Sequence, residues 1–189
     1  IDKRNYTPDL TPREHHRVLF VGRLTTEKHV EVTLGAVAKL APELPNITFD
    51  IVGGGDQRRN LEQTVQRLGI QDRVTFHGRV DEDELRASYG KADVFAIASI
   101  AELQSIATME AMASGLPIVA ANAVALPHLV QDGENGYLFE PGNVDDLADK
   151  LRLVLTASPE EYLRMQQASL EGVEIHDIEK TLDTFEKLY

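Results

Sequence analysis

Two glutamates are the residues of this sequence best suited to bind or transform a ligand. Glu102 and Glu110 are separated by seven residues, and an expected helix over 106–114 begins between them. Glu110 lies among alanines and methionines that can pack closely on a sheet, where a carboxylate is costly unless something hydrogen-bonds it. Ser105 can cap this helix and leave backbone N–H groups free for an anion. Two interpretations remain open, because Glu110 either binds a ligand or faces solvent on an amphipathic helix.

A second group of residues suits a phosphate. Gly22 and Arg23 follow an apolar run, and Lys28 is expected in the first turn of a helix over 27–40. Cations at that end oppose the helix dipole, which favours anions there. A phosphate held by Arg23, Lys28 and backbone N–H groups is one interpretation. A solvated lysine paired with a neighbouring glutamate is the other.

Three further clusters have simpler explanations. Gly53-Gly54-Gly55 follows an apolar run, but Arg58 breaks the G-x-G-x-x-G pattern, so a tight turn explains the glycines better than a dinucleotide site. Asp81-Glu82-Asp83 matches the metal-binding pattern D-x-D, but acids also complement the dipole at the start of a helix expected at 83–90. His15-His16 lies in a polar stretch with no further ligand nearby. We therefore expect no metal site.

Short apolar runs alternate with amphipathic stretches, and this alternation predicts the elements that position these residues. Strands are expected at 17–22, 47–53, 73–78, 92–98, 116–121 and 136–139, and helices at 27–40, 57–68, 83–90, 106–114, 144–155, 159–170 and 176–188. Continuous Val, Ile and Phe runs are typical of strands buried on both faces of a parallel sheet. We predict an α/β, Rossmann-like, doubly wound parallel sheet of about six strands. Such sheets bind ligands at the carboxyl ends of their strands.

Composition excludes several classes of protein. The net charge of −12 argues against nucleic acid as a partner and against membrane contact through anionic lipid. The chain has no cysteine, which excludes disulfides and fits a cytoplasmic protein. It has no apolar run long enough to span a membrane. It begins at Ile1 instead of Met, so we expect an excised piece of a larger protein, with residues 1–16 as a linker and 17–175 as one domain.

The order of the motifs resembles that of a known family. From about Val18 to Leu155 the chain carries V-G-R-L-T-T-E-K, V-G-G-G, F-H-G-R-V, A-D-V-F-A-I-A-S, E-x7-E followed by A-M-A-S-G-L-P-I-V-A, and D-G-E-N-G-Y-L-F. This set resembles the C-terminal, donor-binding domain of retaining glycosyltransferases with the GT-B fold (family 4, or glycosyl transferases group 1). In such enzymes the C-terminal helix, here 176–189, packs back toward the N-terminal domain.

The resemblance implies a reaction and its partners. It implies metal-independent, retaining transfer of a hexose from a nucleoside-diphosphate sugar, with no cofactor and with a UDP-sugar favoured over a GDP-sugar. The acceptor would be a glycolipid, a polysaccharide or a small molecule, bound by the missing N-terminal domain. A lipid acceptor would associate the whole enzyme with a membrane through that missing half. This half alone would be inactive, since catalysis occurs between the two domains.

The resemblance also implies a role for each matching residue. Glu102 would be the catalytic residue that contacts the sugar hydroxyls, and Glu110 would accept both ribose hydroxyls. Arg23 and Lys28 would hold the diphosphate, and Arg79 would stack on the base. The whole implied donor-binding set is Gly22, Arg23, Lys28, Gly54, Arg79, Val80, Gln104, Ser105, Ile106 and Glu110.

Three departures from the family pattern leave the sugar open. His29 replaces a common glycine, and Leu103-Gln104 replaces the usual Phe-Gly or Gly-Phe pair. Residues 123–128 replace a Gly-Gly-x-x-Glu pattern, so His128 takes the acidic position. Two other functions remain possible: a nucleotide-sugar 2-epimerase of the same fold, and a non-catalytic module that binds nucleotide sugars.

Overall fold

A single parallel sheet forms the centre of the molecule. The computed structural model describes residues 1–176. Its strands are β1 (Arg17–Val21), β2 (Thr48–Val52), β3 (Val74–Gly78), β4 (Val94–Ile97), β5 (Ile118–Ala121) and β6 (Gly136–Phe139). They lie in the order β3-β2-β1-β4-β5-β6, and each neighbouring pair is parallel. The predicted doubly wound, Rossmann-like sheet is confirmed.

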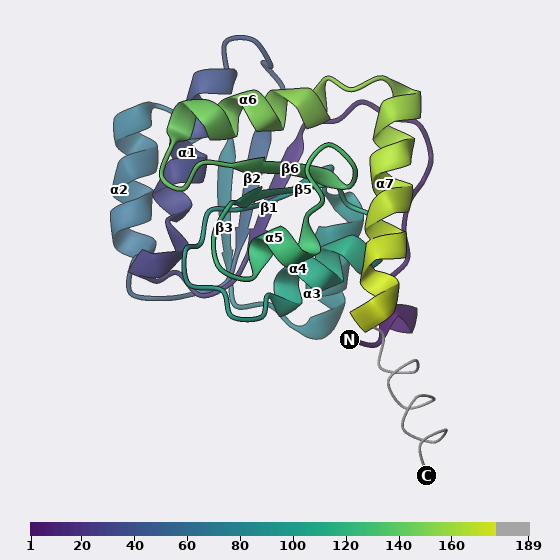
Figure 1. Cartoon of the computed structure of the whole chain (residues 1–189). Coiled ribbons are helices and arrows are strands. Elements are labelled where there is room, and N and C mark those ends of the chain that lie inside the picture. Colours follow the sequence, from purple (N-terminus) through teal and green to yellow (C-terminus); the bar gives the residue numbers. More distant parts are fainter. Residues whose placement is uncertain (177–189) are drawn as a thin grey trace.

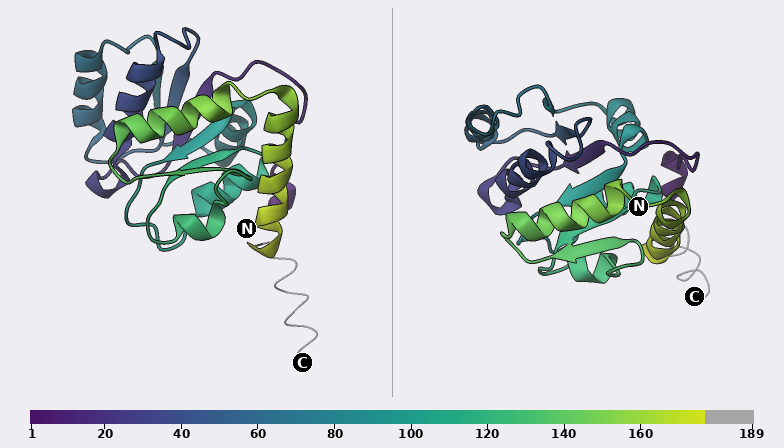
Figure 2. Two further views of the ribbon diagram at one scale, coloured as in Figure 1. Left: turned by 45° about the horizontal axis from the view of Figure 1, so that its top comes forward. Right: turned by 90° about the horizontal axis from the view of Figure 1, so that it is seen from above.

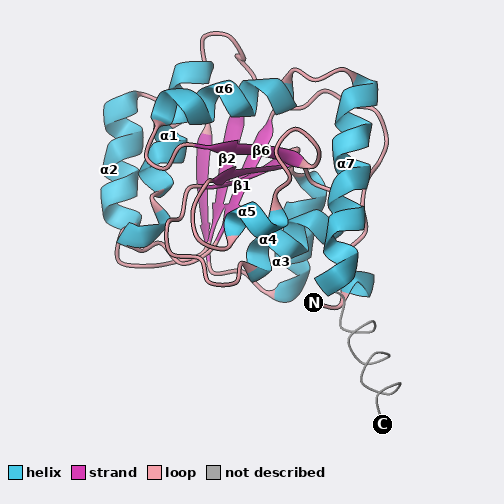
Figure 3. Ribbon diagram, viewed as in Figure 1, coloured by secondary structure: helices cyan, strands magenta, loops and turns pink. Residues whose placement is uncertain are grey.

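Helices cover both faces of this sheet (Figures 1 and 3). They are α1 (Val30–Leu40), α2 (Arg58–Leu68), α3 (Glu82–Lys91), α4 (Ile106–Ala113), α5 (Leu126–Leu129), α6 (Val144–Leu155) and α7 (Pro159–Val173), with short 3₁₀ turns η1 (Lys3–Asn5), η2 (Thr26–Lys28) and η3 (Glu174–His176). Helices α1 and α6 pack together on one face, whereas α3, α4 and α5 lie on the other. Helix α7 packs on α4 at the end of the sheet. None of the helices in residues 1–176 has the length and apolar character needed to cross a membrane.

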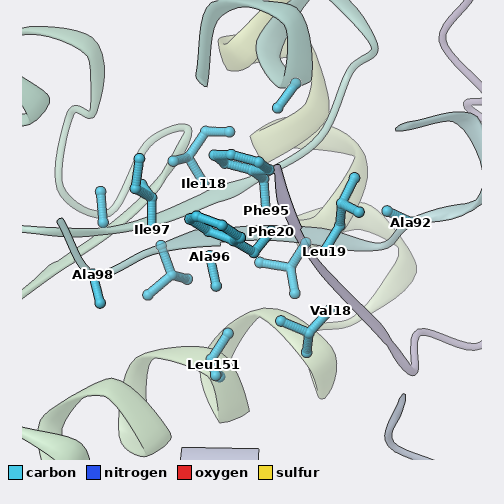
Figure 4. Close-up of a cluster of buried hydrophobic side chains, with 14 of the residues drawn as sticks. Val18, Leu19, Phe20, Ala92, Phe95, Ala96, Ile97, Ala98, Ile118 and Leu151 are labelled. Atoms are coloured by element: carbon cyan, nitrogen blue, oxygen red, sulfur yellow. The ribbon is translucent and has the colours of Figure 1, made fainter. Parts of the chain in front are cut away.

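The core explains why the central strands read as continuous apolar runs. Val18 of β1, Phe95 of β4 and Leu151 of α6 are completely buried (Figure 4). Strands with helices on both faces have no solvated side, so alternation between polar and apolar residues disappears. At every strand end, the predicted boundary lies within two residues of the observed one.

The chain between β1 and α1 differs from the prediction. Instead of one helix over 27–40, η2 ends at Lys28 and α1 begins at Val30. His29 separates them with the left-handed values φ 48° and ψ 40°, which an α-helix cannot contain. The prediction that Lys28 lies in the first turn of that helix is therefore wrong. The helix α5 was not predicted, because four residues are too few to show a helical periodicity in the sequence.

Residues 1–16, predicted as a linker, pack against the domain. Figure 2 shows this segment running beside α7. Its His15 is buried and stacks on Tyr162 with ring centroids 3.5 Å apart. Gln166 donates a hydrogen bond of 2.9 Å to the carbonyl oxygen of Asp9, and the N-terminal amine donates one of 3.0 Å to that of His176. The expected C-terminal helix lies outside the described residues except for His176, which belongs to η3.

Candidate functional site

A cavity of about 380 Å³ opens at the carboxyl ends of β1, β2 and β3. The strand order reverses beside β1, and ligands of doubly wound sheets bind at such a switch point. The cavity is lined by Val21, Gly22, Arg23, Val52, Gly53, Gly54, Arg79, Val80 and Leu85. Five of these residues belong to the predicted donor-binding set, namely Gly22, Arg23, Gly54, Arg79 and Val80. Residues far apart in the sequence thus meet where the sheet topology predicts a ligand.

Glycines bring the loops around this cavity into backbone contact. Gly53 has φ 132°, and a Cβ atom there would lie 1.8 Å from the carbonyl oxygen of Gly22. A Cβ at Gly55 would lie 2.3 Å from the carbonyl oxygen of Leu24. Neither distance is possible for a residue with a side chain. Gly53 and Gly55 therefore serve close packing of two loops, whereas Gly54 faces the side chain of Arg79 with space for a Cβ.

Lys28 and Glu102 form an ion pair, although neither residue lines the 380 Å³ cavity. Glu102 is 8% exposed, and the two side chains are largely shielded from water. The carbonyl oxygen of Glu102 also accepts a 3.1 Å hydrogen bond from the N–H of Ala125. The alternative in which Lys28 pairs with a neighbouring glutamate is therefore wrong, because its partner lies 74 residues away. The residue implied for phosphate and the residue implied for sugar are in direct contact.

Glu110 accepts hydrogen bonds from two tyrosines. The hydroxyl of Tyr6 donates to Oε1 at 2.8 Å, and the hydroxyl of Tyr89 donates to Oε2 at 2.9 Å. Burial, together with the charge of Glu110, raises the pKa of both tyrosines well above the usual range. Glu110 is half-buried and does not line the 380 Å³ cavity. The alternative in which Glu110 simply faces solvent is wrong.

Ser105 caps the helix that carries Glu110. Its Oγ accepts the N–H of Thr108 at 3.4 Å and lies 2.7 Å from the hydroxyl oxygen of that residue. The first N–H groups of an α-helix have no partner within the helix, so those at the start of α4 are donors for an anion. Gln104 and Ile106 flank this end of the helix and are exposed. The backbone site at 104–106 stays a prediction.

The acidic triplet opens α3, as predicted. The carboxylate of Asp81 accepts the N–H of Glu84 at 2.9 Å, and the carboxylate of Glu84 accepts the N–H of Asp81 at 3.3 Å. This reciprocal cap at the start of α3 explains why acidic residues stand there. Within residues 1–176, no three His, Asp or Glu side chains are grouped so that they could hold a metal ion.

The sequence model of the family described as glycosyl transferases group 1 matches residues 3–171. The chain belongs to this family.

The chain is similar to a named enzyme and to a solved domain of the group 1 family. A sulfoquinovosyl transferase of Arabidopsis thaliana is 36% identical over 141 residues, which are 73% of this chain and 26% of that enzyme. The crystal structure of the C-terminal domain of a group 1 family protein from Francisella tularensis is 25% identical, with a TM-score of 0.83 over 94% of this chain and 99% of that one.

A third relative was solved with ligands. The pneumococcal O-GlcNAc transferase, in complex with UDP and GlcNAc, is 25% identical, with a TM-score of 0.80 over 97% of this chain and 38% of that one. The chain spans between 26% and 49% of the length of three curated relatives that it matches. It corresponds to the C-terminal domain of a group 1 glycosyltransferase.

Sequence reasoning missed two features of this glycosyltransferase domain. The first is the pair of tyrosines that donate to Glu110, which belong to no recognised motif; Tyr6 stands in the stretch predicted as a linker. Val124 has φ 52°, a left-handed value that is rare for a β-branched residue. It lies in the segment where the family pattern commonly has two glycines. That substitution was the available signal for unusual backbone, and a valine held this way is strained.

Proposed function

We propose that this chain binds the nucleoside-diphosphate sugar of a retaining hexosyltransferase, with a UDP-sugar favoured over a GDP-sugar. The observation that carries the proposal is the cavity at the carboxyl ends of β1, β2 and β3, which gathers Arg23, Arg79 and the glycine loops beside the switch point between β1 and β4. The ion pair of Lys28 and Glu102 lies on the neighbouring loops. UDP in the pneumococcal relative supports the choice of base.

Protein charges replace a metal ion in this proposal. Arg23 and Lys28 supply two positive charges to a diphosphate, and the N–H groups at the start of α4 add donors. Lys28 would exchange Glu102 for a phosphate oxygen when the donor binds. That exchange would release the carboxylate of Glu102 to the sugar hydroxyls. Because the released carboxylate is shielded from water, it would form strong charge-assisted hydrogen bonds with those hydroxyls.

The proposed chemistry needs no protein nucleophile. The oxygen of the acceptor hydroxyl bonds to the anomeric carbon on the face from which the diphosphate departs. The bond from that carbon to the phosphate oxygen breaks, and the hydroxyl proton passes to the departing phosphate. Configuration is retained because both events occur on one face. Glu102 positions the sugar during this step.

Two other functions fit the same cavity. A 2-epimerase would need acid and base carboxylates supplied from the other half of the cleft, and a binding module would need no second half at all. The full-length protein distinguishes them: sugar transfer to an acceptor supports the proposal. Release of an epimerised sugar, or binding without any turnover, would contradict it.

Binding of UDP by this chain should be measurable and independent of divalent metal. The diphosphate contacts proposed above all lie within residues 1–176, so calorimetry with millimolar UDP should detect weak binding. The dissociation constant should be the same in EDTA and in Mg²⁺ or Mn²⁺, since Arg23 and Lys28 balance the charge. Loss of binding in EDTA with recovery in Mn²⁺ would contradict this. Absence of binding to UDP, GDP and ADP alike would overturn the whole proposal.

Apolar side chains around Glu102 support an acceptor with a lipid part. Four aliphatic residues near Glu102, on its own loop, at the start of α4 and on the loop of Ala125, are exposed: Ile100 by 45%, Leu103 by 88%, Ile106 by 56% and Val124 by 52%. Exposed aliphatic groups gathered beside a polar site are typical of a surface that contacts another apolar group. We propose that the acceptor is held mainly by the other half of the enzyme and that its apolar part contacts these loops.

Replacing Leu103 with serine should weaken an apolar acceptor selectively. In the full-length enzyme, the KM for a lipid acceptor should rise roughly tenfold or more, because burying one leucine contributes about 1.5 kcal/mol or more. The KM for the donor should not change. Leu153→Ser is the control, since Leu153 is also exposed but lies on α6. Equal effects of both substitutions, or none from Leu103→Ser, would contradict a lipid acceptor at this surface.

A further inference from the structure

The carboxylate of Glu110 is held between segments that are distant in sequence. Tyr6 precedes it by 104 residues and belongs to the N-terminal segment, whereas Tyr89 lies near the end of α3. The two aromatic rings also meet edge to face, with centroids 6.1 Å apart and planes at 79°. Tyr89 is fully buried, and its hydroxyl has a second acceptor in the carbonyl oxygen of Ala107 at 3.2 Å. The side chain of Glu110 therefore has two donors from two different elements.

The hydrogen bonds leave Glu110 with a defined remaining capacity. An ionised carboxylate has about four acceptor sites, two on each oxygen, and it cannot donate. One tyrosine hydroxyl occupies one site on each oxygen. One site on each oxygen remains, which matches a ligand with two adjacent hydroxyls, such as the diol of a ribose. The tyrosines thus restrict where the carboxylate points without using up its capacity.

We propose that Tyr6 is a positioning residue for nucleotide recognition, acting through Glu110. This inference rests on the proposed function, in which Glu110 accepts the ribose hydroxyls. The hydroxyl of Tyr6 holds Oε1 in place, so that Glu110 meets the ribose without first losing its own rotational freedom. The N-terminal segment is then part of the nucleotide site, although it contributes no group to the nucleotide itself.

The surroundings of Tyr6 suit such a role. The N-terminal amine of Ile1 is bonded to the carbonyl of His176, and Arg13 is bonded to the buried carboxylate of Asp93. These contacts lie on either side of Tyr6 in the sequence and hold the segment on the domain. Both tyrosine pKa values are raised, so the hydroxyls keep the protons that they donate throughout the neutral range.

Replacing Tyr6 with phenylalanine should reduce discrimination between UDP and 2′-deoxy-UDP. The substitution removes one oxygen and keeps the ring contact with Tyr89. We expect the affinity for UDP to fall roughly threefold to tenfold and that for 2′-deoxy-UDP to fall less. The ratio of the two dissociation constants should therefore shrink. Titration calorimetry of both nucleotides with the whole chain measures this ratio, and a general loss of folded protein would lower the apparent stoichiometry for both nucleotides and leave the ratio unchanged.

Tyr162→Phe is the matched control. Its hydroxyl is also buried and donates a 2.7 Å hydrogen bond, but to the carbonyl oxygen of Asp93. This variant should lose stability and keep the ratio of UDP to 2′-deoxy-UDP affinity. If the wild-type chain discriminates between the two nucleotides and Tyr6→Phe discriminates equally well, Tyr6 has no positioning role. If the wild-type chain binds UDP without discriminating, the ribose role of Glu110 fails together with this inference. Absence of any UDP binding contradicts the proposed function itself.

Discussion

Glu110→Ala should weaken the binding of UDP by tenfold or more. Under the proposed function, the carboxylate accepts both ribose hydroxyls, and hydrogen bonds to a charged group contribute roughly 1.5–3 kcal/mol each. Losing one such bond already corresponds to about a tenfold change in affinity. The substitution also leaves the hydroxyl of the buried Tyr89 with only the carbonyl of Ala107, so the stability of the domain should fall. Titration calorimetry and thermal unfolding measure the two effects.

Glu102→Ala should give the opposite pattern. Its carboxylate is implied to contact the sugar, so affinity for UDP should stay nearly constant. It can even rise a few-fold, because Lys28 loses its ion-pair partner and becomes free for phosphate. In the full-length enzyme, kcat should fall steeply, since a contact that positions the reacting sugar is lost. Equal loss of UDP affinity in the Glu102 and Glu110 variants would rule out this division of roles.

Asp93→Ala should cause a large loss of stability for a single substitution in the domain. Asp93 is 4% exposed and lies just before β4. Its Oδ2 accepts the N–H groups of His16 and Arg17 at 2.8 and 2.9 Å, and its Oδ1 accepts the Nε–H of Arg13 at 3.0 Å. Removing one member of a buried ion pair destabilises proteins by about 3–5 kcal/mol. Thermal unfolding should show a midpoint lower by roughly 10 °C.

Asp83→Ala is the control for this measurement. The carboxylate of Asp83 is 95% exposed and pairs with Arg86 at 3.1 Å. Exposed pairs contribute roughly 0–1 kcal/mol, so the unfolding midpoint should barely move. A small effect of Asp93→Ala, similar to that of the control, would show that the N-terminal segment is not anchored through this carboxylate.

The contribution of Asp93 should also depend on pH. Burial raises its pKa, but the contacts with His15, with the N–H groups of Arg17 and His16 and with Arg13 outweigh burial, so the pKa is lowered. A carboxyl with a lowered folded pKa stabilises the protein above its unfolded pKa of about 3.9. That stabilisation is lost as pH falls through the folded pKa. The stability difference between the wild type and Asp93→Asn should therefore be constant at neutral pH and shrink below about pH 4.

Local patterns in the sequence predicted most of the fold. Buried strands separated by amphipathic helices specify a parallel sheet, and the chirality of the crossovers leaves few topologies. The acidic start of α3 was also predictable from local sequence, because Asp81 and Glu84 lie within one turn of each other. The break at His29 left no trace in the helical pattern, and its one signal was that His29 stands where the family commonly has a glycine, the residue that adopts left-handed values most readily.

The sequence by itself determined the family, the fold class and which loops border the candidate site. These follow from residue order and short-range periodicity, and they do not depend on which side chains come into contact in the folded chain. Only the tertiary structure decided which side chains pair with the two glutamates. Lys28 bonds to Glu102 and Glu110 to Tyr6 across 74 and 104 residues, and no local pattern records such pairings. Burial makes an unpaired carboxylate costly, so the fold brings each glutamate a partner that only three-dimensional proximity can supply.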